Sequence, residues 1–421
     1  MKEEIIRMNE KTFVHLYQNH QFKSNVIACF LLTDLNREDV TKNALIPAVL
    51  RRGTEHLTTM KDISIKMNDM YGAVFDASID KIGDQQSIQL YISTIDNQYA
   101  LEGEDILSEA LMFMYEVLYH PKLSDGVFDE KYVEGEKDTL RELIKAKINN
   151  KASYAVSRCL EEMLGEEPYA LYKYGYEEDL EKITAENLYE HYQKLLSEGE
   201  LHFYISGNFE KEKIESFFLE RFARGELPHE EKIRTQKAKI EATEVKEVVE
   251  KMDVVQGKLV LGYNVSLPIG KESFYKMLVY NAILGSSSNS KLFQNVREKA
   301  SLAYTIRSSY LKHKGILLIS AGIEADKYEK AVELTLKQVE DMKQGNFTEE
   351  DVKDAKVFLE NLFTSCLDDQ TTMIELSMGQ FVLGVNDTIE EMVANIEQVS
   401  KEDVVEVANQ LNLVTKYYLT K

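Results

Sequence analysis

Apolar side chains recur along this chain with two different periods. Residues 25–33 (NVIACFLLT) and 87–94 (SIQLYIST) are short runs rich in β-branched and aromatic residues, which is typical of β-strands. Residues 104–118 instead carry an apolar stripe at helical spacing, formed by Ile106, Leu107, Ala110, Leu111, Met114, Tyr115 and Leu118. The pattern therefore predicts strands alternating with amphipathic helices, and it assigns the stripe to the hydrophobic core.

The order of these elements repeats in the second half of the chain. Residues 71–118 predict a tyrosine-rich strand, a polar break, a second strand and the helix just described. Residues 303–342 give the same order, and aligning Ile88 with Ile316 sets the two copies 316 − 88 = 228 residues apart. The economical interpretation is a duplicated α+β domain, and the alternative is a coincidental order of elements.

A charged stretch without clear periodicity, residues 225–251, separates the two halves. It contains Pro228 followed by a sequence rich in Lys and Glu, which is typical of an exposed linker. We therefore expect an N-terminal domain over residues 1–228, a linker over 229–245 and a C-terminal domain over 246–421.

Composition narrows the class of protein. Hydrophobic residues make up 44% and charged residues 29% of the 421 positions, as in ordinary globular proteins. Lys and Arg number 50 against 72 Asp and Glu, and the net charge of −22 disfavours a nucleic-acid binder, which needs a basic surface for phosphates. We interpret the acidity as a solubilising surface or, alternatively, as a preference for basic or unfolded peptides.

Cysteine usage and the N-terminal sequence bear on the compartment. Cys29, Cys159 and Cys366 are widely spaced and odd in number, so they indicate neither a disulfide framework nor a C-x-x-C metal site. The sequence MKEEIIRMNEKTF lacks the apolar region of a signal peptide, and no window approaches about 18 consecutive apolar residues. We therefore expect a cytoplasmic protein without a membrane span.

Residues 284–304 (LGSSSNSKLFQNVREKASLAY) carry the most informative motif. A Gly/Ser-rich turn precedes a helix whose Leu292, Phe293 and Val296 are expected to face inward. The segment resembles the C-terminal signature of the insulinase/pitrilysin peptidases and the mitochondrial processing peptidases, through its elements S-K-L-F, V-R-E and L-A-Y. The resemblance covers nearly the whole chain and implies two homologous α+β domains, each a mainly antiparallel sheet packed against helices.

Two side chains of this motif are the best candidates for substrate binding. The resemblance implies that Arg297 and Tyr304 hold a substrate peptide carbonyl and stabilise its developing oxyanion. A guanidinium and a phenol suit this role, because such hydrogen-bond donors gain strength where negative charge appears. The alternative interpretation is a salt-bridging surface arginine and a core tyrosine.

The same resemblance points to a lost zinc site in the N-terminal half. Active members carry H-x-x-E-H on a helix shortly before a G-T dipeptide, with two zinc-binding histidines and a glutamate that activates water. Counting back from the G-T dipeptide at 53–54 places Ala44, Pro47 and Ala48 at these positions. Active relatives supply the third ligand as a glutamate on a downstream helix, and Leu143 occupies that position.

No other zinc pattern replaces the lost one. Glu142 remains beside the third ligand position, but it is one residue out of register. No two histidines stand at H-x-x-x-H or similar spacing among His15, His20, His56, His120, His191, His202, His229 and His313. We therefore expect no metal and no other cofactor in this chain.

A strand of the N-terminal half also matches the family. Residues 71–77 (YGAVFDA) resemble a G-x-x-x-N-A strand beside the catalytic cleft, with Asp76 in place of the asparagine and Ala77 after it. The resemblance implies an edge strand, and an exposed edge can add a substrate peptide by main-chain pairing. The alternative for Asp76 is a solvated carboxylate at the end of a strand.

Intact donors beside a lost zinc site imply a specific role. In two-chain members of this family one subunit supplies zinc and the other supplies the Arg/Tyr pair, so the resemblance implies a non-catalytic subunit of a heterodimeric zinc metallopeptidase. Its partner would be a homologous chain with H-x-x-E-H, and its substrate a peptide. The R-R-G-T and M-Y-G-A segments are similar to a bacterial branch without zinc, some members of which are associated with modification of elongation factor P.

Two other functions are compatible with the sequence. The first is a catalytically inert peptide-binding or scaffold protein with a peptidase fold, and a homodimer of the isolated chain is compatible with it. The second is an autonomous peptidase with an unrecognised site, which is disfavoured because no nucleophile motif such as G-x-S-x-G is visible. A zinc-bearing homologue encoded nearby would favour the peptidase complex over the scaffold.

Overall fold

The computed structural model describes residues 3–222, 234–240 and 244–421. Packing divides the chain into two compact units. The N-terminal unit comprises Met1–Lys145, Leu171–Glu230 and Gln370–Leu376, and the C-terminal unit comprises Ala146–Ala170, Glu231–Asp369 and Ser377–Lys421. The domain bounds 1–228 and 246–421 stay a prediction, and part of the predicted linker, 229–245, lies outside the described residues.

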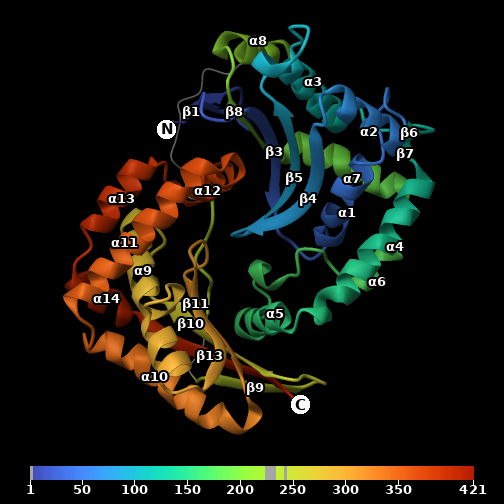
Figure 1. Cartoon of the computed structure of the whole chain (residues 1–421). Coiled ribbons are helices and arrows are strands. Elements are labelled where there is room, and N and C mark those ends of the chain that lie inside the picture. Colours follow the sequence, from blue (N-terminus) through green and yellow to red (C-terminus); the bar gives the residue numbers. More distant parts are fainter. Residues whose placement is uncertain (1–2, 223–233, 241–243) are drawn as a thin grey trace. The chain divides into compact units, whose positions relative to one another are not determined.

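A six-stranded sheet forms the centre of the N-terminal unit (Figure 1). Its strand order is β1-β2-β8-β3-β5-β4, and every neighbouring pair is antiparallel except β2 and β8. The strands predicted at 25–33 and 87–94 are confirmed as β3 and β5. The bounds are β1 (Glu4–Arg7), β2 (Thr12–Gln18), β3 (Ser24–Asp34), β4 (Val74–Ile82), β5 (Gln85–Ile95) and β8 (Glu200–Gly207), with a separate small hairpin of β6 (Leu123–Ser124) and β7 (Val127–Phe128).

The tyrosine-rich strand predicted from residue 71 starts later than expected. Tyr71 and Gly72 have φ values of 59° and 76°, which lie in the left-handed region. Such residues form a turn rather than a strand. β4 therefore begins at Val74.

One face of the N-terminal sheet packs against helices. Ile27, Cys29 and Leu31 of β3 point into a core shared with α1 (Val40–Leu50) and α3 (Ile106–Tyr119). α3 confirms the predicted amphipathic helix, and its stripe is buried except for Tyr115, which is half-buried. The other helices of this unit are α2 (Met60–Asp69), α4 (Glu130–Ala146), α6 (Glu177–Leu180), α7 (Ala185–Glu198) and α8 (Lys211–Arg221).

The C-terminal unit repeats this sheet with one strand fewer. Its order is β11-β12-β10-β13-β9, and β13 with β9 is its one parallel pair. Strand for strand, β4-β5-β3-β8-β2 corresponds to β11-β12-β10-β13-β9, including the parallel pair. The predicted strands and helix at 303–342 are confirmed, and so is the α+β fold class. The bounds are β9 (Lys246–Lys251), β10 (Gly257–Val265), β11 (Ala303–Leu311), β12 (Ile316–Ile323), β13 (Leu411–Thr420) and α10 (Tyr328–Lys343).

Helices pack on both faces of the C-terminal sheet (Figure 1). α5 (Lys151–Leu164) covers one face, where Cys159 and Met163 belong to the same buried cluster as Val260. Gly262 of β10 permits this close approach, because a Cβ there would lie 2.8 Å from the Met163 sulfur. The other face carries α9 (Lys271–Asn281), α10, α11 (Glu349–Ser365), α13 (Ile389–Glu397) and α14 (Lys401–Ala408), while α12 (Gln370–Leu383) divides between the two units. No helix within the described ranges is long and apolar enough to cross a membrane.

The charged stretch at 225–251 is not a linker throughout. Its last six residues form β9, which pairs with β13 at the edge of the C-terminal sheet. Edge strands tolerate charged side chains because one side of the strand faces water. The composition of β9 therefore resembled that of a linker.

Candidate functional site

The three positions that the resemblance assigns to the zinc motif lie on α1 in the N-terminal unit. Ala44 is 5% exposed, Pro47 is buried and Ala48 is half-buried. Pro47 stands inside the helix, where its missing N–H removes one main-chain hydrogen bond. Two methyl groups and a pyrrolidine ring neither bind zinc nor transfer a proton. α1 therefore keeps its packing role without catalytic groups.

Leu143, at the position that the resemblance assigns to the third zinc ligand, lies on α4 and exposes 46% of its surface. Two helical turns earlier, Glu136 pairs with Arg52 at the end of α1, and both Nε and Nη2 of the guanidinium contact Oε1 of the carboxylate. The side chain of Glu136 is 9% exposed, and the guanidinium of Arg52 lies 5.8 Å from the ring centre of Tyr132. An ion pair therefore joins the end of α1 to α4.

A buried polar network supports the start of α1. His191 of α7 contacts the Asn43 side chain, with 2.7 Å between Nε2 and Oδ1, and Asn43 donates to Gln86 Oε1 at 2.9 Å. Nδ1 of His191 lies 3.6 Å from Asp39. Burial lowers the pKa of His191 despite this carboxylate. His191 is therefore a buried histidine whose ring nitrogens both have partners close to α1.

The described residues contain no cluster of three or more His, Cys, Asp and Glu side chains that could hold a metal ion. The fold does bring two histidines together that the sequence spacing did not pair. His15 of β2 and His202 of β8 are fully buried, with 3.0 Å between Nε2 and Nδ1, and His15 also contacts Glu3 at 2.7 Å. These histidines are 187 residues apart in the chain, so their contact follows only from the pairing of β2 with β8.

The strand that carries Asp76 and Ala77 is β4, the last strand of the N-terminal sheet. Its edge position agrees with what the resemblance implied. Asp76 is 59% exposed and pairs with Nη1 of Arg51 at 3.0 Å, while Ala77 is 9% exposed and faces the core. Of these two residues, Asp76 is the one that presents a polar side-chain group to solvent.

The C-terminal motif places Arg297 before, and Tyr304 after, the short turn that joins a helical segment to β11. Arg297 lies on a π-helical segment, η5 (Phe293–Lys299), and Tyr304 follows the first residue of β11. The N–H of Ser301 donates to the carbonyl of Arg297 at 3.1 Å, and Ser301 has a φ of 52°. Leu292 and Val296 are fully buried, as predicted, and they anchor the segment.

The guanidinium of Arg297 is largely open. Its side chain is 42% exposed, and its closest charged contact is Glu298, 3.5 Å from Nε. It lies 4.6 Å from the ring centre of Phe293, which is half-buried rather than turned into the core as predicted. Nη1 and Nη2 have no hydrogen-bond partner within the described part of the chain, so they are available to an acceptor on another molecule.

Tyr304 stands at a β-bulge and points away from the core. The pairing of β11 with β12 shifts between Ala303 and Thr305, and Tyr304 is 59% exposed. Its hydroxyl donates to Glu324 Oε1 at 2.8 Å, and Lys327 binds the other carboxylate oxygen at 3.1 Å. The bond raises the pKa of the Tyr304 phenol and lowers the pKa of Glu324. The phenol must leave Glu324 before it can donate to a substrate carbonyl.

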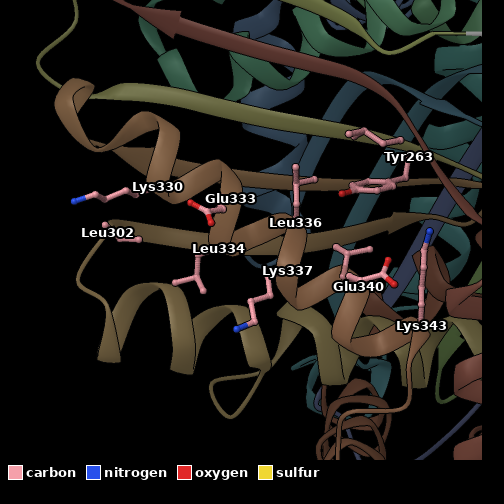
Figure 2. Close-up of a pocket in the computed structure, with 11 residues that line it drawn as sticks. Tyr263, Leu302, Lys330, Glu333, Leu334, Leu336, Lys337, Glu340 and Lys343 are labelled. Atoms are coloured by element: carbon pink, nitrogen blue, oxygen red, sulfur yellow. The ribbon is translucent and has the colours of Figure 1, made fainter.

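A separate hollow of about 800 Å³ lies along α10 in the same unit (Figure 2). Leu302 of the motif and Tyr263 of β10 line it, together with charged side chains of α10: Lys330, Glu333, Lys337, Glu340 and Lys343. Neither Arg297 nor Tyr304 lines it. The motif donors therefore lie on an open surface and not in this hollow.

Comparisons with known proteins identify relatives across the whole chain. The family model described as the peptidase M16 inactive domain matches residues 182–358. The chain is 33% identical to the probable inactive metalloprotease YmfF of Bacillus subtilis over 405 residues, which cover 96% of this chain and 95% of the relative. It is also 24% identical to the uncharacterized zinc protease YmxG of the same species, over 79% of this chain and 80% of the relative.

Solved structures share the fold over the same length. A conserved protein from Enterococcus faecalis superposes with a TM-score of 0.87 at 23% identity, covering 100% of this chain and 99% of that one. A peptidase M16 inactive domain from Pseudomonas fluorescens gives a TM-score of 0.80 at 14% identity, covering 100% and 98%. The motifs, the fold and the full-length relative together show that this chain belongs to the M16 peptidases, the insulinase/pitrilysin family, as a homologue of an inactive metalloprotease.

Proposed function

We propose that this chain is the non-catalytic subunit of a heterodimeric zinc metallopeptidase. One observation carries the proposal. The side chains of Arg297 and Tyr304 are exposed around a well-defined turn, while Ala, Pro, Ala and Leu occupy the four positions that the resemblance assigns to the zinc site. A side chain exposed on a surface turn contributes little to the core, so packing alone does not explain why this turn holds two strong donors. The family membership supports the same conclusion.

The proposed mechanism divides the chemistry between two chains. In the partner, the H-x-x-E-H residues would hold zinc, and the metal would supply an activated water for addition to the peptide carbonyl. In this chain, Arg297 and Tyr304 donate hydrogen bonds to the carbonyl oxygen as it gains negative charge. The amide C–N bond then breaks, and the leaving amine takes up a proton.

The edge of β4 supports peptide binding on the N-terminal unit. Its outer main-chain groups have no strand partner among the described residues, so an extended peptide can pair there. Asp76 offers a carboxylate beside that edge, already neutralised in part by Arg51. A basic residue in the substrate would compete with Arg51 for this carboxylate.

The test is peptidase activity of this chain alone, of a zinc-motif homologue encoded nearby, and of their mixture. We expect activity in the mixture, with Arg297→Ala lowering it about 100-fold, as loss of one oxyanion donor does. Arg307→Ala is the matched control, because Arg307 is also an exposed arginine but lies on β11, outside the motif elements S-K-L-F, V-R-E and L-A-Y. Zinc-dependent activity of the isolated chain, or equal activity of the two variants, would contradict the proposal.

A second candidate is a catalytically inert peptide-binding or scaffold protein. The observation that favours it is the bond between Tyr304 and Glu324, which occupies the phenol proton. Under this alternative, peptides bind this chain in the presence of the homologue but remain uncleaved. The link to elongation factor P modification and the cytoplasmic location stay predictions from the sequence.

A further inference from the structure

The two sheets differ at one edge. In the N-terminal unit β1 covers the outer edge of β2, with Glu4 opposite Leu16 and Arg7 opposite Phe13. β9 is the counterpart of β2, since each is the parallel neighbour of the strand next to it, β13 and β8 respectively. In the described part of the C-terminal unit, no strand covers β9. β9 therefore has an open edge where its counterpart has an antiparallel neighbour.

The ladder fixes which residues face that open edge. The N–H of Met252, immediately after β9, donates to the carbonyl of Thr420 in β13 at 2.8 Å. Main-chain groups of successive residues in a strand point to opposite sides. The even-numbered residues of β9 therefore bond to β13, and the N–H and C=O groups of Glu247, Val249 and Lys251 point outward.

The same three residues also share one face of the sheet. Val249 is 61% exposed, and the side chain of Glu247 is 63% exposed. Lys251 is exposed and has no ion-pair partner among the described residues. The other face of β9 is occupied, because Glu250 accepts hydrogen bonds from Tyr154 of α5 at 2.7 Å and from Tyr417 at 2.6 Å. Along the open edge, every second residue therefore presents in turn an acidic, an apolar and a basic side chain.

We propose that β9 pairs antiparallel with β9 of a second copy of this chain, with Val249 opposite Val249. Hydrogen-bonded antiparallel pairs join residues whose main-chain groups face each other, so odd-numbered residues meet odd-numbered residues. Centring the two-fold axis on Val249 places Glu247 of each copy opposite Lys251 of the other. The pairing forms roughly six main-chain hydrogen bonds and joins the two sheets into one.

The charged side chains of β9 favour this register, and they favour a second copy of the same strand as the partner. Centring on Glu247 or on Lys251 would set like charges opposite each other, which destabilises a sheet pair. Shifting the axis to Val248 would place Glu247 opposite Val249 and remove both ion pairs. Lysines on an edge strand usually prevent pairing between molecules. Here the acid and the base are symmetric about Val249, so the edge is complementary to itself.

Charge reversal tests the interface by sedimentation of the full chain from low micromolar to several hundred micromolar concentrations. We expect the wild type to form a reversible dimer, and Lys251→Glu to weaken it about tenfold or more, because each copy then sets two acids opposite each other. Glu247→Lys should act alike, although it also loses the 2.8 Å bond from Lys416. A mixture of the two single variants should form a heterodimer, and the double variant should recover the homodimer.

An apolar pair of variants provides the matched control. Val249→Lys sets two lysines opposite each other and should abolish the dimer, whereas Val255→Lys changes an exposed valine outside β9 and should not. Circular dichroism checks that each variant is folded. A wild type that stays monomeric at every concentration, or a dimer that resists Lys251→Glu, overturns the proposal. Pairing of β9 with a peptide from another protein would appear as a monomer that does not self-associate.

Discussion

The N-terminal and C-terminal units share one sheet topology but carry different side chains at their motif positions. In the first, α1 holds Ala44, Pro47 and Ala48 at the positions that the resemblance assigns to a zinc motif, and it packs into the core. In the second, the turn that bears Arg297 and Tyr304 keeps both donors exposed. α1 needs no polar ligand at these positions to fold, because buried apolar neighbours stabilise it. The fold of the N-terminal unit therefore does not depend on polar side chains at these positions.

The largest expected effect concerns the core beneath the Arg/Tyr turn. Leu292 is fully buried, so Leu292→Ala should lower the free energy of unfolding by about 2–5 kcal/mol through lost contacts and a cavity. Denaturant unfolding measures the change. Lys299→Ala, on the exposed side of the same segment, should change it by less than about 0.5 kcal/mol. Equal effects of both variants would show that the turn is not anchored through its buried face.

The next effect concerns the ion pair that joins α1 to α4. Arg52→Ala leaves the Glu136 carboxylate, 9% exposed, without its partner, and should cost about 2 kcal/mol of folding free energy. Adding Glu136→Gln should recover part of this loss, because the buried charge is removed. If Arg52→Ala is as stable as the wild type, the ion pair does not hold these helices together.

The free energy of unfolding at acidic pH should depend on the protonation of His191 in the N-terminal unit. Burial lowers the pKa of His191 below its ordinary value of 6.5, so the unfolded chain binds the proton more readily. The stability contributed by neutral His191 is complete above pH 6.5 and is lost as the pH falls from that value through the lower pKa of the folded state. His191→Gln should flatten this part of the profile of unfolding free energy against pH. If the slope of unfolding free energy against pH is unchanged in His191→Gln, His191 is not the source of this pH dependence.

The smallest effect is local to Tyr304. Glu324→Gln removes the carboxylate that raises the pKa of the phenol, so this pKa should fall toward its ordinary value. Titration by NMR of the labelled tyrosine carbons measures it, and Tyr304→Phe identifies the signal. No stability change is expected, because both groups are exposed. A pKa that stays in place would show that the phenol is not held by Glu324 in solution.

Periodicity predicted the elements that bury one regular face. β3, β5, β11, β12 and the two helices α3 and α10 were visible because their apolar residues recur at the period of a strand or helix. The motifs identified Arg297 and Tyr304 by sequence alone. Their bulge and their contacts with Phe293 and Glu324 required the structure.

Features formed between distant segments were not predictable in this way. The sequence of a helix such as α5 indicates which of its faces is buried. It does not indicate which sheet that face covers. Arg52 and Glu136 are 84 residues apart, and neither belongs to a pattern that pairs them. The strand KEVVEK resembled a linker because charges dominate an edge strand, whereas its register follows only from the ladder with β13.

The central claim is that this chain supplies donors to an active site completed by another chain. The most direct test is to titrate a zinc-motif homologue with wild-type chain and then to displace the wild type with Arg297→Ala. The account predicts that activity rises until the two chains are equimolar, and that the variant binds equally well but suppresses activity as it displaces the wild type. Activity that is independent of this chain, or a variant that supports full activity, would contradict the account.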